Sequence, residues 1–390
     1  MKGKPLLTIF FVVFLDLVGF GIIIPILPYY SRAFGATAFE LGWLMASFSI
    51  AQFLFAPFWG SLSDHYGRRP ILIATIGGIT IATLATAYAN SLLFLFIARS
   101  LAGVFGANIS TASAYIADVT KPEDRAKGMG IIGAGFGLGF IFGPAIGGIL
   151  SPYGYEVPLL FAAGLSIINM VFAYFRLEEA PISEEKRELN RRRVNLGLAK
   201  LALAKRSTAL PILCFFFVTF AFTQLEVAFA LYVLHTFHYT AKEAGILLAI
   251  MGLVMVAMQG GMIGRLSKRF GEPVLVVFGL ALMASALLVA GLATQVAVFI
   301  ASLVAIALAN GLINPSLSSL LSKASRHDER GATMGIYQSA GSLARIFGPP
   351  VSGFFFEHIS KASPIFLSSA VMALTLLLAK ELWKENAELS

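Results

Sequence analysis

Charged residues and cysteine are scarce in this chain. Asp, Glu, Lys and Arg make up 13% of its 390 residues, whereas a soluble globular domain carries about 25%. The one cysteine, Cys214, lies inside an apolar run, which excludes a disulfide framework and a cysteine metal site. Hydrophobic residues reach 57% and the mean hydropathy is +0.81. Because such a chain would expose too much apolar surface in water, we expect lipid to be its solvent.

Motifs of nucleotide-driven pumps and of enzymes are also absent. The phosphate-binding pattern G-x-x-x-x-G-K-S/T does not occur, and nothing resembles a catalytic triad or a metal-hydrolase motif. His235 and His238 have the i, i+3 spacing of metal ligands, but no third ligand is evident, and a surface position is the simpler interpretation. We therefore expect no enzymatic activity, no cofactor and no metal, and an ion gradient as the energy source.

The chain does contain a long internal repeat. Gly60–Pro70 returns as Gly264–Pro273, which is one residue shorter; the offset is 204 residues from the first glycine, and Lys268 stands in place of an aspartate. The pair Gly143-Pro144 returns as Gly348-Pro349, an offset of 205. Tandem halves in a very hydrophobic chain are typical of secondary transporters, which bind substrate at the interface between the halves.

Twelve apolar segments each approach the length of about 20 residues that spans a bilayer as a helix. They lie at about 6–28, 41–61, 71–89, 92–115, 128–150, 158–176, 211–234, 243–264, 273–291, 295–321, 331–355 and 363–382. They predict an all-α membrane protein of twelve transmembrane helices in two pseudo-symmetric six-helix bundles. The bundles would comprise residues 1–176 and 207–390, joined by a polar cytoplasmic linker loop at 177–206.

The first apolar segment has the basic start of a signal peptide but not its other features. Asp16, Pro25 and Pro28 interrupt the apolar run, and no small-residue cleavage site follows. We therefore expect the first helix to be retained in the protein.

Lys and Arg are distributed unevenly over the predicted loops. If both termini are cytoplasmic, 24 of the 29 Lys and Arg residues fall in cytoplasmic segments and only three in outer loops. Since positive residues gather on the cytoplasmic side of membrane proteins, we expect a multi-pass inner-membrane protein with both termini in the cytoplasm. The basic run Arg191–Arg193 then belongs to a solvated loop near anionic headgroups, and no nucleic-acid partner is expected.

Several motifs resemble those of a known family. Residues 60–69 are similar to the signature G-x-L-x-D-x-x-G-R-R of the major facilitator superfamily, and residues 99–106 to its R-x-x-x-G motif. The glycine-rich stretch at 133–148 is similar to a motif associated with antiporters. Residues 16–28 and 114–120 look especially like bacterial tetracycline/proton antiporters. The resemblance covers nearly the whole chain and is closest to the drug/proton antiporters with twelve helices.

The resemblance implies a cytoplasmic gate in the loop after the second helix. Asp64 would be directed toward the opposite half and Arg68 toward Asp118, as ion pairs that hold one of two states; a solvated positive loop is the alternative. The two glycines of this loop permit tight turns and close helix approach. The full gate comprises Gly60, Asp64, Gly67, Arg68, Arg69 and Asp118.

The fifth predicted helix carries a stripe of glycines. Gly139, Gly143 and Gly147 share one face at i, i+4 and i+8, and Pro144 predicts a kink. We expect this stripe to form a close, bendable seam between the halves.

Four ionisable residues fall inside predicted spans, each at a cost of about 3 kcal/mol on insertion scales. Because burial favours the neutral form of a carboxyl group, Asp16 and Glu226 are candidate proton carriers. Arg99 is placed to tune a carboxylate or to face an anionic group. Structural pairing is the alternative for each; for Glu226 it is equally favoured, and for Arg345 it is preferred.

Polar residues on other helices are candidates for a substrate cavity. Asn310, Asn314 and Ser318 form one polar stripe at i, i+4 and i+8. Gln224 precedes Glu226 by two positions, or about 200° around an ideal helix, so both face the cavity centre only if the helix unwinds. The candidate cavity residues are Asn108, Gln224, Asn310, Asn314 and Ser318.

These patterns together predict a secondary transporter. We expect a monomer in the lipid bilayer that exports an amphiphilic, drug-like or tetracycline-like small molecule in exchange for protons by alternating access. Uptake or facilitated diffusion of a sugar or organic acid, and flipping of a lipid or lipid-linked substrate, remain alternatives. A non-transporting membrane sensor would need an appended soluble domain, which this sequence does not contain.

Overall fold

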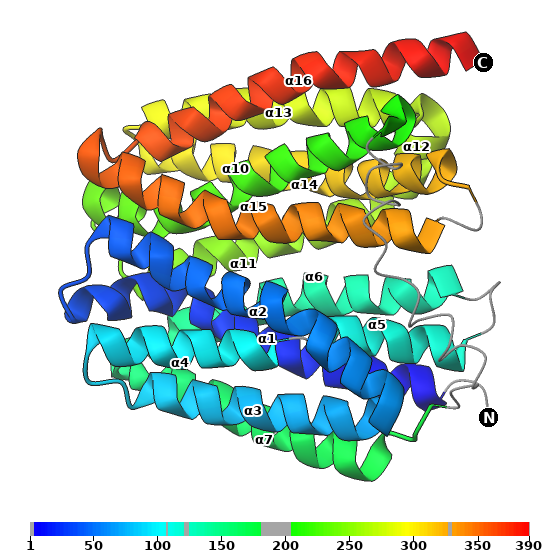
Figure 1. The fold of residues 1–390 in the computed structure, drawn as a ribbon. Helices are drawn as coiled ribbons and strands as arrows, with labels where there is room; N and C mark the ends of the chain where they lie inside the picture. Colours follow the sequence, from blue (N-terminus) through cyan, green and yellow to red (C-terminus); the bar gives the residue numbers. More distant parts are fainter. Residues whose placement is uncertain (1–3, 107, 121–124, 181–203, 327–329, 390) are drawn as a thin grey trace. The chain divides into compact units, whose positions relative to one another are not determined.

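A computed structural model describes residues 4–106, 108–120, 125–180, 204–326 and 330–389. These residues form helices and no strands (Figure 1). The N-terminal half contains α1 (Lys4–Ala33), α2 (Ala38–Tyr66), α3 (Arg68–Ala87), α4 (Leu92–Phe105), α5 (Asn108–Val119), α6 (Arg125–Leu150), η2 (Ser151–Tyr153) and α7 (Glu156–Arg176). The C-terminal half contains α10 (Arg206–Phe237), α11 (Ala241–Ala257), η3 (Met258–Met262), α12 (Ile263–Phe270), α13 (Glu272–Leu292), α14 (Val296–Ala324), α15 (Arg330–His358) and α16 (Ser363–Leu389).

The predicted twelve-helix fold is confirmed. The pair α4–α5 and the run α11–η3–α12 each make one crossing, which brings the described helices to the twelve crossings expected from the sequence. Among the described residues, eleven crossings are long and apolar enough to span a membrane by themselves. The exception is α15, whose sequence carries arginines at positions 330 and 345 and many small residues. Most of the expected linker loop, residues 181–203, lies outside the described residues.

The chain divides into two compact units. The first comprises Met1–Ala36, Leu44–Arg192 and Tyr239–Leu253, and the second comprises Thr37–Trp43, Arg193–His238 and Val254–Ser390. The first residues of α2 therefore belong to the second unit, and most of α11 belongs to the first. Each unit is built mainly from the helices of one sequence half and borrows helical turns from the other.

Glycines explain how each unit accommodates these borrowed turns. In the first unit, a Cβ atom on Gly148 would lie 2.8 Å from the carbonyl oxygen of Lys242 in α11. In the second unit, a Cβ on Gly353 would lie 2.8 Å from the Cα of Phe39 in α2. Gly148 and Gly353 are 205 residues apart, so the sequence repeat preserves this close backbone contact.

The first unit is organised around α1, which packs against α6, α7 and α5, and around α3, which packs against α4 and α7 (Figure 1). A buried apolar cluster joins these helices, with Val12 and Leu17 of α1 packed near Ile76 of α3 and Ile116 of α5. In the second unit α10 packs against α15, α16 and α14, and α13 packs against α14 and α16. The pairing of helices is therefore similar in the two units.

The glycine stripe of α6 packs closely, but against a different partner from the one expected. A Cβ on Gly139 would lie 2.7 Å from the Cβ of Leu17, and one on Gly143 would lie 2.6 Å from the Cα of Gly21. A Cβ on Gly147 would lie 2.5 Å from the carbonyl oxygen of Ile22. This face is thus a seam with α1 inside the first unit, whereas α6 meets α11 through Phe140, Pro144 and Gly148. Pro144 lies within α6, which continues through it.

Replacing Gly143 by valine should destabilise the first unit. The new side chain would overlap the α1 backbone at Gly21, and overpacking of this kind costs about 1–3 kcal/mol. We expect a lower thermal unfolding midpoint for purified Gly143→Val than for the unmodified protein. The matched control is Gly164→Val on α7, because a Cβ at Gly164 meets no atom within 4 Å. Equal midpoints for the two variants would contradict the close α1–α6 contact.

Candidate functional site

Side chains of α2 donate hydrogen bonds to two carbonyl groups at the end of α4. Trp59 donates from Nε1 to the carbonyl oxygen of Val104 at 2.6 Å, and Gln52 donates from Nε2 to that of Gly106 at 2.5 Å. These donors satisfy carbonyl groups that a helix end leaves without intrahelical partners. Since α5 begins at Asn108, the interruption between α4 and α5 places this side chain at the first position of a new helix.

Asp16 of α1 meets Asn108 inside the first unit. The Nδ2 group of Asn108 donates to the Oδ1 atom of Asp16 at 3.1 Å. Asn108 is 5% exposed and Asp16 is half-buried. One turn earlier on α1, Asn169 of α7 donates from Nδ2 to the carbonyl oxygen of Val12 at 2.9 Å. The structure thus brings one predicted proton carrier and one predicted cavity residue together.

Arg99 is buried on α4 but contacts an aromatic ring. Its side chain is 5% exposed, and its guanidinium carbon lies 4.8 Å from the ring centre of Phe48 in α2. The Nε atom is buried without a hydrogen-bond partner in the described part of the chain. Cation–π contact offsets part of the cost of burying such a charge. Its observed contact is with Phe48, whereas Asp16 is bonded to Asn108.

Glu226 and Arg345 interact electrostatically in the second unit. They come from α10 and α15, and both side chains are half-buried. Arg345 also donates from Nη2 to Ser342 Oγ at 3.5 Å, within α15. In the second unit, the carboxyl group of Glu226 therefore interacts with an arginine. In the first unit, the carboxyl group of Asp16 is bonded to a neutral amide.

Gln224 lies on a different side of α10 from Glu226, as the helical spacing predicts. It is fully buried, and neither its Oε1 nor its Nε2 atom has a partner in the described residues. The helix α10 continues without interruption from Arg206 to Phe237, so no unwinding brings the two side chains to one face.

The polar stripe of α14 contains an internal hydrogen bond. Asn314 donates from Nδ2 to the Oδ1 atom of Asn310 at 2.6 Å, and Ser318 is half-buried one turn further along. The neighbouring η3 turn has π-helical geometry, and a Cβ on Gly311 of α14 would lie 2.9 Å from the Cβ of Met258 in η3. Single π-helical turns within α-helices are frequent at functional sites.

The predicted gate residues form a compact charge cluster. Arg68 lies 2.5 Å from Asp64 through Nη2 and 3.0 Å from Asp118 through Nε. Its Nη1 atom also donates to Ser63 Oγ at 2.6 Å. Arg68 is 5% exposed and Asp118 is 9% exposed. The expected contact with Asp118 is therefore present, and Asp64, which the resemblance directs toward the opposite half, pairs with Arg68 as well.

A further acid belongs to this cluster, although no motif in the sequence points to it. Glu179 follows α7 and accepts hydrogen bonds from the backbone N–H of Arg68 at 2.7 Å and of Arg69 at 3.2 Å. Gly67 has φ 104°, and a Cβ there would lie 2.7 Å from Glu179 Oε2. The turn needs Gly67 because of its positive φ, whereas Gly60 lies inside α2 with open space around it. Arg69 itself donates from Nη2 to the carbonyl oxygen of Tyr174 at 2.6 Å.

The second unit carries the same arrangement with the charges reversed. Lys323 of α14 pairs with Glu272 of α13 at 2.5 Å, and Ser319 donates to the same carboxylate at 3.0 Å. By the repeat offsets of 204 and 205, Glu272 stands where the first half has Arg68, and Lys323 where it has Asp118. The turn before α13 is again a glycine, Gly271, with φ 79°. Lys323 is 65% exposed, so this pair is much more open to solvent than its counterpart.

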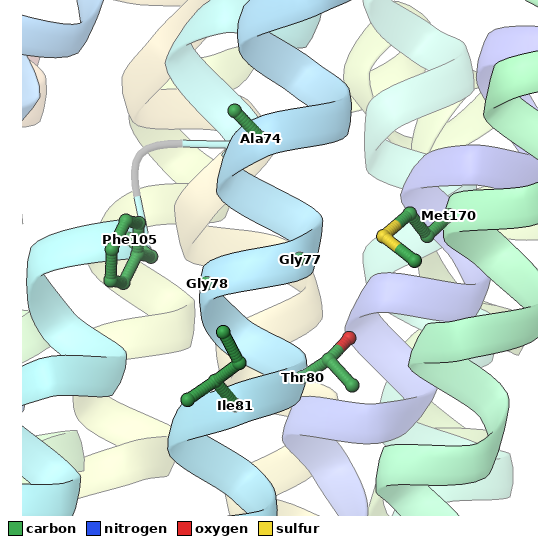
Figure 2. A pocket seen from close by; sticks show the side chains of 7 residues that line it. All are labelled: Ala74, Gly77, Gly78, Thr80, Ile81, Phe105 and Met170. Atoms are coloured by element: carbon green, nitrogen blue, oxygen red, sulfur yellow. The ribbon is translucent and has the colours of Figure 1, made fainter.

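An apolar hollow on α3 lies apart from all of these polar residues. Its volume is about 400 Å³, and it forms because Gly77 and Gly78 lack side chains. Figure 2 shows Phe105 and Met170 on opposite sides of α3, and Ile81 further along the same helix. The hollow contains no charged group. Among the described residues, no group of three or more His, Cys, Asp and Glu is placed to hold a metal ion.

Comparison with known proteins gives a consistent family. The family model of the Major Facilitator Superfamily matches residues 9–262 and, in a second match, residues 213–389. The class C tetracycline resistance protein of Escherichia coli is 34% identical over 357 residues, which cover 89% of this chain and 88% of that protein. Multidrug resistance protein 2 of Bacillus subtilis (strain 168) is 30% identical over 382 residues, covering 96% of this chain and 94% of that protein.

Two solved structures share the fold. The human organic anion transporter MFSD10 (TETRAN) has a TM-score of 0.74 at 24% identity, covering 97% of this chain and 99% of that chain. The nucleoside transporter NupG has a TM-score of 0.77 at 16% identity, with the same coverage of 97% and 99%. At these identities the likeness concerns architecture only.

Removing the carboxylate of Glu179 should weaken the charge cluster. Loss of an acceptor at a helix N-terminus costs about 1 kcal/mol, so Glu179→Ala should lower the thermal unfolding midpoint of the purified protein. Glu178→Ala is the matched control, because Glu178 is the adjacent exposed acid. If both variants unfold at the same temperature, Glu179 does not stabilise α3.

Exchanging the charges of the reversed pair should be tolerated. Glu272→Lys alone places two cations side by side and should lower the thermal unfolding midpoint. Adding Lys323→Glu restores an opposite-charge pair and should recover most of the loss, on the scale of about 1 kcal/mol for an exposed pair. A double variant no more stable than Glu272→Lys would show that the pair contributes nothing through its charges.

Proposed function

Since this chain belongs to the Major Facilitator Superfamily, we propose that it exports an amphiphilic small molecule in exchange for protons by alternating access. The relatives described above are named for resistance to tetracycline or to multiple drugs, which supports export of a drug-like or tetracycline-like compound. The many apolar helices and the family membership make the chain an integral membrane transporter. We propose the direction of transport, the coupling ion and the substrate class.

One observation carries the proposal of proton coupling. Each sequence half places a single carboxyl group within its first helix, Asp16 in α1 and Glu226 in α10. An ionised carboxylate in hydrocarbon costs about 3 kcal/mol on insertion scales, and proton uptake removes that charge. A carboxyl group held among apolar helices is therefore suited to exchange protons during transport.

The partners of the two carboxyl groups suggest a division of roles. Asp16 bonds to the neutral amide of Asn108, so its gain or loss of a proton changes the local net charge. Glu226 interacts with the guanidinium of Arg345, so its carboxylate has a partner of opposite charge. We assign the exchanged proton to Asp16 first, and we assign to the Glu226–Arg345 pair a role in binding substrate or in setting the local field.

Competition between proton and substrate would drive the cycle. Proton uptake at Asp16 from the outside would disfavour substrate, and proton release to the inside would allow substrate to bind again. Arg99 would raise the local positive potential, and the polar residues of α10 and α14 would line the cavity. These lining residues are Gln224, Asn310, Asn314 and Ser318. The cluster around Arg68 would act as a latch that holds one of the two states.

The distribution of Lys and Arg supports an inner-membrane location with both termini in the cytoplasm. We propose two bundles, residues 1–176 and 207–390, joined by a cytoplasmic linker at 177–206. Since one chain contains both halves of its pathway, a monomer suffices for transport.

Proteoliposomes with an imposed proton gradient test the proposal. Internal pH would be followed with an enclosed dye while tetracycline and lipophilic cations are added one at a time. We expect substrate-triggered proton movement in the unmodified protein and its loss in Asp16→Asn. Glu226→Gln should reduce substrate affinity more than it reduces the number of protons moved per substrate.

Glu178→Gln serves as the matched control, because it removes an exposed acid next to α7. It should transport like the unmodified protein. If all of these proteins move substrate equally well without a proton gradient, the antiport proposal is wrong and facilitated diffusion or lipid flipping takes its place.

A further inference from the structure

One amide atom of Asn108 forms a hydrogen bond, and the other forms none within the described residues. Its Nδ2 group donates to the carboxylate of Asp16, while its Oδ1 atom is buried and accepts no hydrogen bond in the described residues. A buried carbonyl oxygen without a donor is unfavourable, because burial removes its hydrogen bonds to water. A side chain that is 5% exposed and carries this cost needs an explanation.

The hydrogen-bonding chemistry of the amide and the carboxyl group explains why the Oδ1 atom is left without a donor. An amide presents a donor and an acceptor on the same carbon atom, and a carboxyl group presents two oxygens in the same way. When the carboxyl group is ionised, only the amide N–H has a use. When the carboxyl group is protonated, its O–H needs an acceptor. The Oδ1 atom of Asn108 can serve, because it belongs to the same amide group as the Nδ2 atom that already bonds to Asp16.

The surroundings leave the amide as the polar partner of Asp16. α1 meets α2 through Phe20 and Phe48, and the Phe48 ring contacts the guanidinium of Arg99 on α4. The titratable residues of α2 itself lie near its two ends. The helices with the most extensive packing against α1 are α5, α6 and α7. Their titratable residues are Tyr115 and Asp118 on α5, Arg125 and Lys127 at the start of α6, and Glu156, Tyr174 and Arg176 near the two ends of α7. On α1 itself the others are Lys4, Tyr29, Tyr30 and Arg32 at its ends. Among the residues that the structure describes, Asn108 is the side chain that hydrogen-bonds to the carboxyl group.

Apolar packing keeps this partner in place. Val12, Val13 and Leu17 of α1 belong to the same buried cluster as Ala112 and Ile116 of α5. The interruption before α5 is pinned to α2 by Gln52 and Trp59. The amide therefore lies on a helix that packs against α1 through its apolar side chains.

We propose that Asn108 is a positioning residue that serves the Asp16 carboxyl group in both of its protonation states. Its N–H donates to the carboxylate, and its carbonyl oxygen accepts the O–H of the acid. Proton uptake forms one O–H bond on Asp16 from a hydrated proton, releases water and creates one new hydrogen bond between α1 and α5. This inference rests on the proposed proton exchange at Asp16 and adds the residue that makes both forms stable.

Infrared difference spectroscopy tests the inference directly. The purified protein in lipid would be stepped from alkaline to acidic buffer, and the C=O stretching band of protonated carboxyl groups would be recorded. The band that disappears in Asp16→Asn belongs to Asp16. In Asn108→Leu and in the smaller Asn108→Ala, we expect this band at higher wavenumber, because the acid has lost its hydrogen-bond acceptor.

Asn169→Leu is the matched control. Asn169 is also fully buried and also donates to α1, at the Val12 carbonyl oxygen, but it does not contact the carboxyl group. Its variant should leave the Asp16 band unchanged. Two Asn108 variants are used so that overpacking in one does not decide the result, and a thermal melt of each confirms that it is folded.

The outcomes separate the inference from the function on which it rests. A band that is absent in Asp16→Asn but unmoved in both Asn108 variants would overturn the role of Asn108 and leave proton exchange at Asp16 intact. An equal shift in Asn169→Leu would also overturn it, as a general packing effect. If Asp16→Asn removes no band at all, Asp16 takes up no proton, and the proposed coupling fails together with the inference.

Discussion

The cost of placing charge in hydrocarbon governs the arrangement of this protein. Each ionisable group within a span costs about 3 kcal/mol unless a partner offsets it. The structure uses a different partner for each: an amide for Asp16, an aromatic face for Arg99 and an arginine for Glu226. These choices decide which groups can change their charge easily, and a transporter driven by an ion gradient depends on that property.

Interruptions of helices position the polar groups. The break between α4 and α5 makes Asn108 the first residue of a helix, where its side chain reaches Asp16. In the second half, the π-helical turn η3 lies against Gly311, between the two asparagines of the α14 stripe. Backbone groups freed by such breaks need new partners in lipid, and α2 supplies two of them to α4.

The repeat conserves geometry more strictly than chemistry. Gly67 and Gly271 both have positive φ, and each precedes a helix whose first residue forms an ion pair. The charges of the pair are reversed between the two halves. The two pairs also differ in their exposure to solvent. The Arg68–Asp118 pair is nearly closed to solvent, and Glu179 caps the helix that begins at Arg68. The second pair has one member largely in solvent. The two ion pairs therefore differ in how far solvent reaches them.

The sequence by itself determined the twelve crossings, because the length of an apolar run and the thickness of a bilayer are both local properties. It also singled out Asp16 and Glu226 as candidate proton carriers, and its family resemblance implied the pairing of Arg68 with Asp118. Tertiary structure alone decided the partners: Glu179 lies 111 residues from the backbone it caps, and the stripe of Gly139, Gly143 and Gly147 packs on α1 rather than between the halves. Helical periodicity shows which residues share a face, but which neighbour that face meets depends on packing across the whole bundle.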